Sequence, residues 1–200
     1  MDKPTIDFYN LHANEQAALY ETADMSSMYN RLATLLKDRG KILEIGCGSG
    51  RDARALANMG FSVVATDASE GMIREAKRLS AGNVCGLSFA WLPFPISKRH
   101  ALFTEQFDLV LAVAVLMHLS PQDRQSVLYQ VARLLKPGGI FFCTFKNEMS
   151  HDNRLYQQIL PAELIVECDN AGMKCFLQES SNDILGRVAT WMTLAFRAIK

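Results

Sequence analysis

The sequence lacks the features of membrane proteins and of proteins that coat nucleic acids. Its longest apolar run, residues 109–117, is far shorter than the ~20 residues that a membrane-spanning helix needs. Its first ten residues, MDKPTIDFYN, are too polar for the apolar part of a secretory signal. Lys and Arg total 21, as do Asp and Glu, so there is no basic excess to neutralise phosphates. We expect no membrane partner and no nucleic-acid partner.

Paired cysteine motifs are also missing. The five cysteines are odd in number and include no C-x-x-C pair. Cys85, Cys143 and Cys175 lie inside apolar runs, where cysteine behaves as a small hydrophobic residue. This usage favours a reduced, intracellular protein, and we expect a cytoplasmic location.

Apolar strand-like runs alternate with helix-like segments, which is typical of layered α/β folds with a mainly parallel sheet. Two hundred residues are enough for one domain with its own core. We predict a single domain over 1–200, with a helical N-terminal cap at 1–38 and an α/β core at 39–200. The expected strands are 41–45, 61–66, 84–90, 107–113, 140–145, 173–178 and 188–199, and the expected core helices are 51–59, 69–79, 120–135 and 161–171.

A glycine turn between an expected strand and an expected helix is the most informative segment. Gly46, Gly48 and Gly50 alternate with other residues, and the helix starts at Arg51. Glycine allows positive φ and close approach of a ligand, and a helix start exposes unpaired N–H groups. Asp67 ends the next strand, where a parallel sheet places a carboxylate for ribose hydroxyls. The turn and the carboxylate together predict a site for an adenosine-containing ligand.

The spacing of the turn separates the classes of nucleotide ligand. The dinucleotide fingerprint G-x-G-x-x-G needs glycine at its sixth position, where this sequence has Arg51. The Walker A pattern fails because no Gly-Lys-Ser/Thr follows. Two plainer interpretations stay open. The glycines would then form only a tight turn, and Asp67 would only precede a helix cap at Ser69.

The motif Glu44-x-Gly46-x-Gly48-x-Gly50, with Asp67 ending the next strand, resembles the cofactor signature of class I S-adenosylmethionine-dependent methyltransferases. Residues 107–110 (FDLV) are similar to the family's fourth strand, and residues 134–139 (LLKPGG) to its helix stop before strand five. The resemblance covers most of the chain. It implies a Rossmann-like α/β fold: a seven-stranded, mostly parallel sheet in the order 3-2-1-4-5-7-6, with strand 7 antiparallel and helices on both faces.

The resemblance also implies S-adenosyl-L-methionine as cofactor. Glu44 would fix the glycine loop near the cofactor's amino group, and Asp67 would accept both ribose hydroxyls. The family often has an acidic residue after strand three, but residues 88–94 contain none, so backbone and ring contacts would replace it. The cofactor-binding residues that we predict are Glu44, Gly46, Cys47, Gly48, Gly50, Asp67, Ala68, Met72, Ala90, Trp91 and Tyr20.

His118 follows the fourth expected strand, at the rim where substrates enter such sheets. It is our candidate catalytic residue, as a general base, and packing before a capped helix is the alternative. Tyr9 and Tyr20 lie in the N-terminal arm, which covers the cofactor in similar proteins. A tyrosine hydroxyl there would reach the donor's carboxylate, unless both rings only pack in the core. The other histidines have no metal-ligand spacing, which predicts no metal site.

Methyl transfer from a sulfonium is an in-line displacement that needs alignment and exclusion of water rather than a fixed catalytic constellation. The sequence has no Asn-Pro-Pro-Tyr or Pro-Cys motif of base-modifying enzymes. We therefore predict an enzyme, a methyltransferase acting on a small molecule beneath a lid of residues 1–38, 93–106 and 147–160. The alternatives are a non-catalytic cofactor-binding module and a nicotinamide-dependent oxidoreductase.

Overall fold

The computed structural model describes residues 2–36, 40–82, 84–146, 154–183 and 189–199. The helices are α1 (Lys3–Leu11), α2 (Ala13–Glu21), α3 (Ser26–Leu35), α4 (Arg51–Asn58), α5 (Glu70–Leu79), α6 (Pro121–Leu134) and α7 (Pro161–Asn170), with 3₁₀ turns η1 (Ala101–Thr104) and η2 (Leu116–His118). The strands are β1 (Lys41–Ile45), β2 (Ser62–Asp67), β3 (Leu87–Trp91), β4 (Phe107–Val113), β5 (Leu135–Lys146), β6 (Met173–Asn182) and β7 (Thr190–Ala198). None of the described helices is both long enough and apolar enough to cross a bilayer.

The seven strands form one sheet in the order β3-β2-β1-β4-β5-β7-β6. The strands from β1 to β5 pair in parallel, and β7 runs antiparallel to both β5 and β6. The predicted order and the predicted antiparallel strand are both confirmed. The carboxyl ends of the parallel strands therefore meet at one edge, where such sheets bind their ligands.

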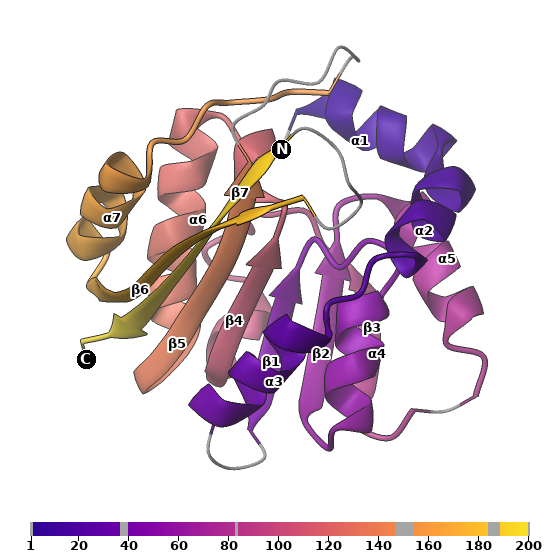
Figure 1. The fold of residues 1–200 in the computed structure, drawn as a ribbon, viewed down its shortest axis with the longest axis horizontal. Coiled ribbons are helices and arrows are strands. Elements are labelled where there is room, and N and C mark those ends of the chain that lie inside the picture. The colour runs from indigo at the N-terminus through magenta and orange to yellow at the C-terminus, as the bar shows by residue number, and fades with distance from the viewer. Residues whose placement is uncertain (1, 37–39, 83, 147–153, 184–188, 200) are drawn as a thin grey trace.

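Helices cover both faces of the sheet, as predicted (Figure 1). Ile42 of β1 faces a core closed by α3, α4 and α5, whereas Leu43 faces a core closed by α6 and α7. Neighbouring strand residues point to opposite faces, so a sheet covered twice needs uninterrupted apolar strands. This explains why the central strands read as continuous apolar runs.

Local capping fixes two of the core helices. Ser69 and Ser120 are the N-caps of α5 and α6, and their hydroxyls accept hydrogen bonds from the Met72 and Asp123 N–H groups, both at 3.1 Å.

Some strand boundaries differ from prediction. β5 begins at Leu135, before the two glycines that were expected to separate helix from strand. β3 begins at Leu87, three residues late, because Gly86 turns the chain at a φ of +78°.

Helices α1 and α2 pack beside the carboxyl ends of the parallel strands, whereas α3 lies over a face of the sheet (Figure 1). α2 lies against α5, where Ala17 and Met72 are buried together. Asn10 at the end of α1 accepts hydrogen bonds from the Ser69 hydroxyl at 2.8 Å and from the Gly71 N–H at 2.9 Å. A side chain of the cap thus joins the N-terminus of α5, a contact that no local sequence pattern indicated.

Candidate functional site

The glycine turn connects β1 to α4, and all three of its glycines have positive φ, at +72°, +53° and +74°. A Cβ on Gly46 would lie 2.4 Å from Val115 Cγ2, and one on Gly50 would lie 2.7 Å from Phe89 Cε1. Both positions are therefore closed to a side chain by packing as well as by conformation. Gly48, between them, faces the cavity described below.

Asp67 at the end of β2 holds the turn from the neighbouring strand. Its Oδ2 accepts a hydrogen bond from the Gly48 N–H at 2.9 Å, and its Oδ1 accepts one from the Ser69 N–H at 2.8 Å. Burial raises the pKa of Asp67, and these N–H donors oppose that rise. Asp67 thus serves the turn and the helix cap, and its carboxylate still lines the cavity, where it can accept further hydrogen bonds.

Glu44 of β1 is 1% exposed, and no hydrogen-bond partner of its Oε2 occurs in the part of the chain that the structure describes. Burial raises the pKa of Glu44 well above its usual range. The charges of Asp52 and Asp67 raise it further, and Arg51 lowers it. Buried polar atoms are nearly always hydrogen-bonded, so this carboxyl suits a donor that enters from the cavity.

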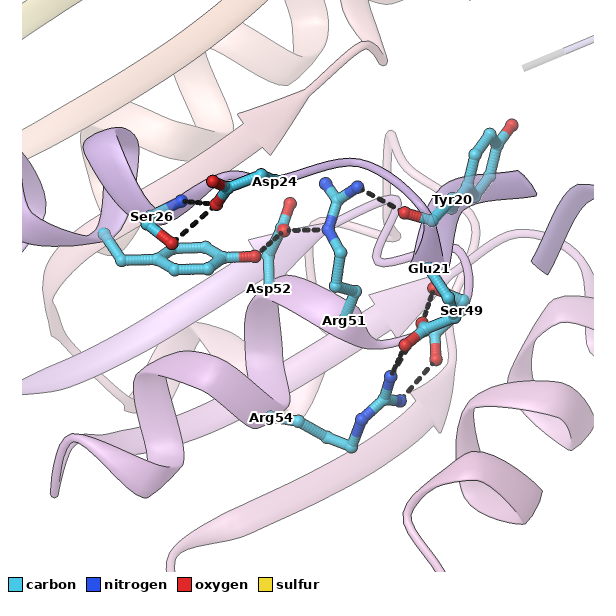
Figure 2. Close-up of polar contacts among 9 residues, drawn as sticks. Tyr20, Glu21, Asp24, Ser26, Ser49, Arg51, Asp52 and Arg54 are labelled. Atoms are coloured by element: carbon cyan, nitrogen blue, oxygen red, sulfur yellow. Dashed lines mark hydrogen bonds and ion pairs between the residues drawn. The ribbon is translucent and has the colours of Figure 1, made fainter. Parts of the chain in front are cut away.

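An ion pair and a hydrogen bond of Glu21 fasten the N-terminal cap to α4 and to the glycine turn (Figure 2). Arg54 Nη2 of α4 lies 2.7 Å from both carboxylate oxygens of Glu21, at the end of α2. The Ser49 hydroxyl donates to Glu21 Oε1 at 2.6 Å. The last turn of α2 is therefore tied both to the turn and to the helix that follows it.

A second set of contacts passes through Asp52. Its Oδ1 accepts hydrogen bonds from the Tyr29 hydroxyl at 2.6 Å and from Arg51 Nε at 2.7 Å. Arg51 Nη1 also donates to the Tyr20 carbonyl at 2.6 Å (Figure 2). The Arg51 guanidinium is therefore engaged by the Tyr20 carbonyl of the cap and by the Asp52 carboxylate. Arg51 stands at the position where a dinucleotide-binding turn would have glycine.

These elements enclose a cavity of about 540 Å³, within the usual size range of small-molecule sites. Its walls come from the cap, the glycine turn, the carboxyl ends of β4 and β5 and the adjoining ends of β6 and β7. The predicted site residues that line it are Tyr20, Glu44, Gly46, Cys47, Gly48, Asp67, Met72 and His118.

Four predicted cofactor residues, and one predicted lid segment, are not among the residues that line the cavity. Gly50 packs against Phe89, and Ala68 is buried beside the end of β2. Ala90 is exposed, and Trp91 is 55% exposed with its indole N–H donating to the Ala68 carbonyl at 2.9 Å. No residue of 93–106 lines the cavity, so this segment is not part of the lid. Of the third expected lid segment, residues 147–153 lie outside the described residues.

A family model described as a methyltransferase domain matches residues 42–139, from β1 through the glycine turn to the start of β5. Together with the strand order, this match decides the family. The chain belongs to the class I S-adenosylmethionine-dependent methyltransferases. The match includes the glycine turn and Asp67, on which the predicted resemblance depended.

Named relatives agree with this methyltransferase family. A ubiquinone biosynthesis O-methyltransferase of Caulobacter vibrioides is 38% identical over 106 residues, which cover 53% of this chain and 40% of that protein. The enzyme of the same name from Dinoroseobacter shibae is 36% identical over 149 residues, covering 72% of this chain and 57% of that protein. The chain thus spans about half the length of these curated relatives.

A solved structure extends the similarity of fold to nearly the whole chain. The 1,6-didemethyltoxoflavin-N1-methyltransferase of Burkholderia thailandensis, with bound 1,6-didemethyltoxoflavin and S-adenosylhomocysteine, superposes with a TM-score of 0.73. The two proteins are 21% identical, and the match covers 98% of this chain and 84% of the other. At this identity the likeness concerns the fold alone.

His118 lies in η2, shortly after β4, and is 3% exposed. Its ring contacts the Tyr9 hydroxyl and the Leu155 carbonyl and packs edge-on against Tyr156. The histidine is therefore packed and hydrogen-bonded at the cavity wall, and its role as a general base stays a prediction.

Several residues of the cavity wall were not predicted. Arg154 and Tyr156 belong to the predicted lid segment 147–160 but were not named as site residues, and Glu179 and Asp183 come from the end of β6 and the residue after it. Arg31 Nη1 of α3 donates to Glu179 Oε1 at 2.6 Å, and so joins the cap to the sheet. No motif marked Glu179 or Asp183, and the lid prediction did not single out Arg154 or Tyr156 within its segment. Within the described segments, no group of three or more His, Cys, Asp or Glu side chains is arranged to bind a metal ion.

Proposed function

We propose that the chain binds S-adenosyl-L-methionine in this cavity and transfers its methyl group to a small-molecule acceptor. The observation that carries the proposal is the buried Glu44 carboxyl, whose Oε2 has no partner among the described residues, directly before the glycine turn. The cofactor brings an ammonium group, which donates hydrogen bonds and carries positive charge. Such a group would satisfy Glu44 and offset the burial of its charge.

The charges around the turn also discriminate between ligands. Glu44, Asp52 and Asp67 all line the cavity beside the turn. A pyrophosphate would lie among these carboxylates and be repelled, whereas a ligand with a sulfonium and an ammonium would be attracted. The nicotinamide-dependent alternative is therefore disfavoured on charge as well as on spacing.

Each part of the site then has a role. The bound cofactor supplies a methyl group activated by its positive sulfur. Asp67 accepts the ribose hydroxyls while it keeps the Gly48 and Ser69 N–H groups in place. Met72 provides an apolar wall, and the cap, tied down through Glu21 and Arg54, keeps water away from the reaction.

The domain organisation fits the same proposal. Residues 1–38 act as the cap and residues 39–200 as the catalytic core of one domain. A cavity of about 540 Å³ beneath a cap suits a small acceptor better than a polymer. The O-methyltransferase relatives and the N-methyltransferase neighbour both act, by their names, on small molecules, which supports this acceptor class.

Thermal denaturation with S-adenosylmethionine, S-adenosylhomocysteine, NAD and NADP tests the proposal. At 100 times the Kd a ligand stabilises the fold by about 2.7 kcal/mol, which is about 5–11 °C in Tm for a domain of this size. We expect this shift with the first two ligands only. A shift with NAD alone would refute the proposal. Binding without S-adenosylhomocysteine production across a broad acceptor panel would favour the non-catalytic module.

A further inference from the structure

The hydrogen bonds of His118 fix where its proton lies. Its Nδ1 is 2.8 Å from the Leu155 carbonyl oxygen, which can only accept a hydrogen bond, so Nδ1 carries the proton. In the neutral ring Nε2 is then an acceptor, and the Tyr9 hydroxyl, 3.2 Å away, donates to it. The ring therefore presents a basic nitrogen to Tyr9.

Tyr9 connects this buried nitrogen to the cavity. It comes from α1, lines the cavity and contacts the ring of His118 edge-on, with centroids 5.8 Å apart. Arg154 Nη1 donates to the Tyr9 hydroxyl oxygen at 3.0 Å, and its guanidinium lies over the Phe8 and Tyr9 rings. A cation at the phenol oxygen stabilises the negative charge that develops there when the phenol proton moves towards His118.

We propose that Tyr9 and His118 form a proton relay that serves a hydroxyl acceptor, an inference that rests on the proposed methyl transfer. The acceptor O–H proton passes to the Tyr9 oxygen while the Tyr9 proton passes to His118 Nε2. The acceptor oxygen bonds to the methyl carbon as the carbon–sulfur bond breaks, and the electron pair of that bond neutralises the sulfonium. The positive charge ends on the imidazolium, which releases its proton to water. Tyr9 is then the catalytic residue, and His118 acts through it.

The presence of a relay bears on the chemical class of the acceptor. A hydroxyl must lose its proton to become a strong nucleophile, whereas a neutral amine attacks with its lone pair before any proton leaves. A purely structural pair would only join α1 to η2 and would not respond to pH during turnover. The charged and titratable groups that face the pair are Arg154, Tyr156 and Tyr20 of α2, whose phenol pKa rises through burial and through Tyr9. Lys146 at the end of β5 lies behind them, over the Tyr156 ring.

Kinetics of the full chain with catechol and 3,4-dihydroxybenzoate as acceptors test the relay. Tyr9→Phe removes only the hydroxyl, and His118→Asn keeps an N–H for the Leu155 carbonyl. We expect each to lower kcat about 100-fold or more, with unchanged affinity for S-adenosylhomocysteine. The wild-type rate should fall towards acidic pH, because a protonated His118 takes no further proton. Both variants should lose this pH dependence. Tyr129→Phe, the same change at a half-exposed tyrosine of α6, is the matched control.

Three results from active enzyme would overturn the relay. They are turnover with amine acceptors only, variants that change KM but not kcat, and a pH profile that survives Tyr9→Phe. Absence of turnover with both hydroxyl probes also refutes the relay. If S-adenosylhomocysteine still binds in that case, the proposed cofactor site stands.

Imidazole ¹⁵N NMR gives a readout without turnover. His118 should be protonated on Nδ1, and Tyr9→Phe should shift its Nε2 signal; a ring protonated on Nε2 contradicts the proposal.

Discussion

Replacing Glu44 by Gln is expected to stabilise the ligand-free protein and to weaken cofactor binding. The Glu44 side chain is buried, and a buried polar atom without a partner destabilises a fold by about 1–3 kcal/mol, or more when it is charged. A neutral amide relieves part of this cost. A gain of about 2 kcal/mol corresponds to a rise of about 4–8 °C in Tm for 200 residues.

The pH dependence of this gain has a definite sign. Because the pKa of Glu44 is raised in the folded state, its protonation stabilises the fold at low pH. That contribution is lost as the pH rises through the folded-state pKa. The advantage of Glu44→Gln should therefore be larger at alkaline pH, where the wild-type carboxyl must carry its charge, than at acidic pH.

Cofactor affinity should change in the opposite direction. Loss of a charged acceptor for the cofactor's ammonium weakens binding by about 10- to 150-fold. Differential scanning calorimetry without ligand and isothermal titration with S-adenosylhomocysteine measure the two effects. Glu70→Gln, at an exposed position in the first turn of α5, is the matched control and should change neither. A Glu44→Gln protein that melts lower at every pH, or binds as tightly as wild type, would refute the reasoning.

Further substitutions test the remaining parts of the site. Asp67→Asn should weaken S-adenosylhomocysteine binding about 10- to 150-fold. Because the pKa of Asp67 is raised, wild-type affinity should also fall as acid protonates this carboxylate, and titrations across pH should find the variant insensitive. Gly46→Ala and Gly138→Ala place a side chain at a φ of +72° and +74°, but only the first meets another atom within 4 Å. Chemical denaturation should find Gly46→Ala about 1–3 kcal/mol less stable than Gly138→Ala. Arg54→Ala removes the ion pair between α2 and α4, so amide exchange in α2 should accelerate at equal global stability.

The architecture of the core was predictable because its determinants are local and repetitive. Strands buried on both faces read as apolar runs, and the Ser120-Pro121 start of α6 carries its own capping signal. Boundaries were less predictable where glycine conformation decides them. Gly138 has a positive φ yet lies within β5, so the glycines that were expected to end a helix form part of a strand instead.

The glycine turn and Asp67, the proposed cofactor half of the site, were predictable for a related reason. Gly48 and Asp67 belong to adjacent parallel strands and their turns, so the sequence spacing of one βαβ unit brings them together. The cap's contacts had no such spacing. Glu21 and Arg54 are single charged residues on two helices, and their pairing depends on how α2 packs on the core. Surface charges of this kind look alike in sequence whether they meet a partner or water.

The shape of the glycine turn does not determine the charge of its ligand. A strand, a tight turn and a helix start also form the sites for pyrophosphates, because exposed N–H groups attract anions. Here the charges nearby oppose that preference. Asp52 brings negative charge to the turn and Glu44 brings a buried carboxyl that a nearby cation would help to ionise, while Arg51, the residue best placed to attract an anion, is held by Asp52 and by the Tyr20 carbonyl. A cation of suitable shape therefore gains most from this pocket, and removing the Glu44 charge should reduce the preference for sulfonium over dinucleotide without altering the turn.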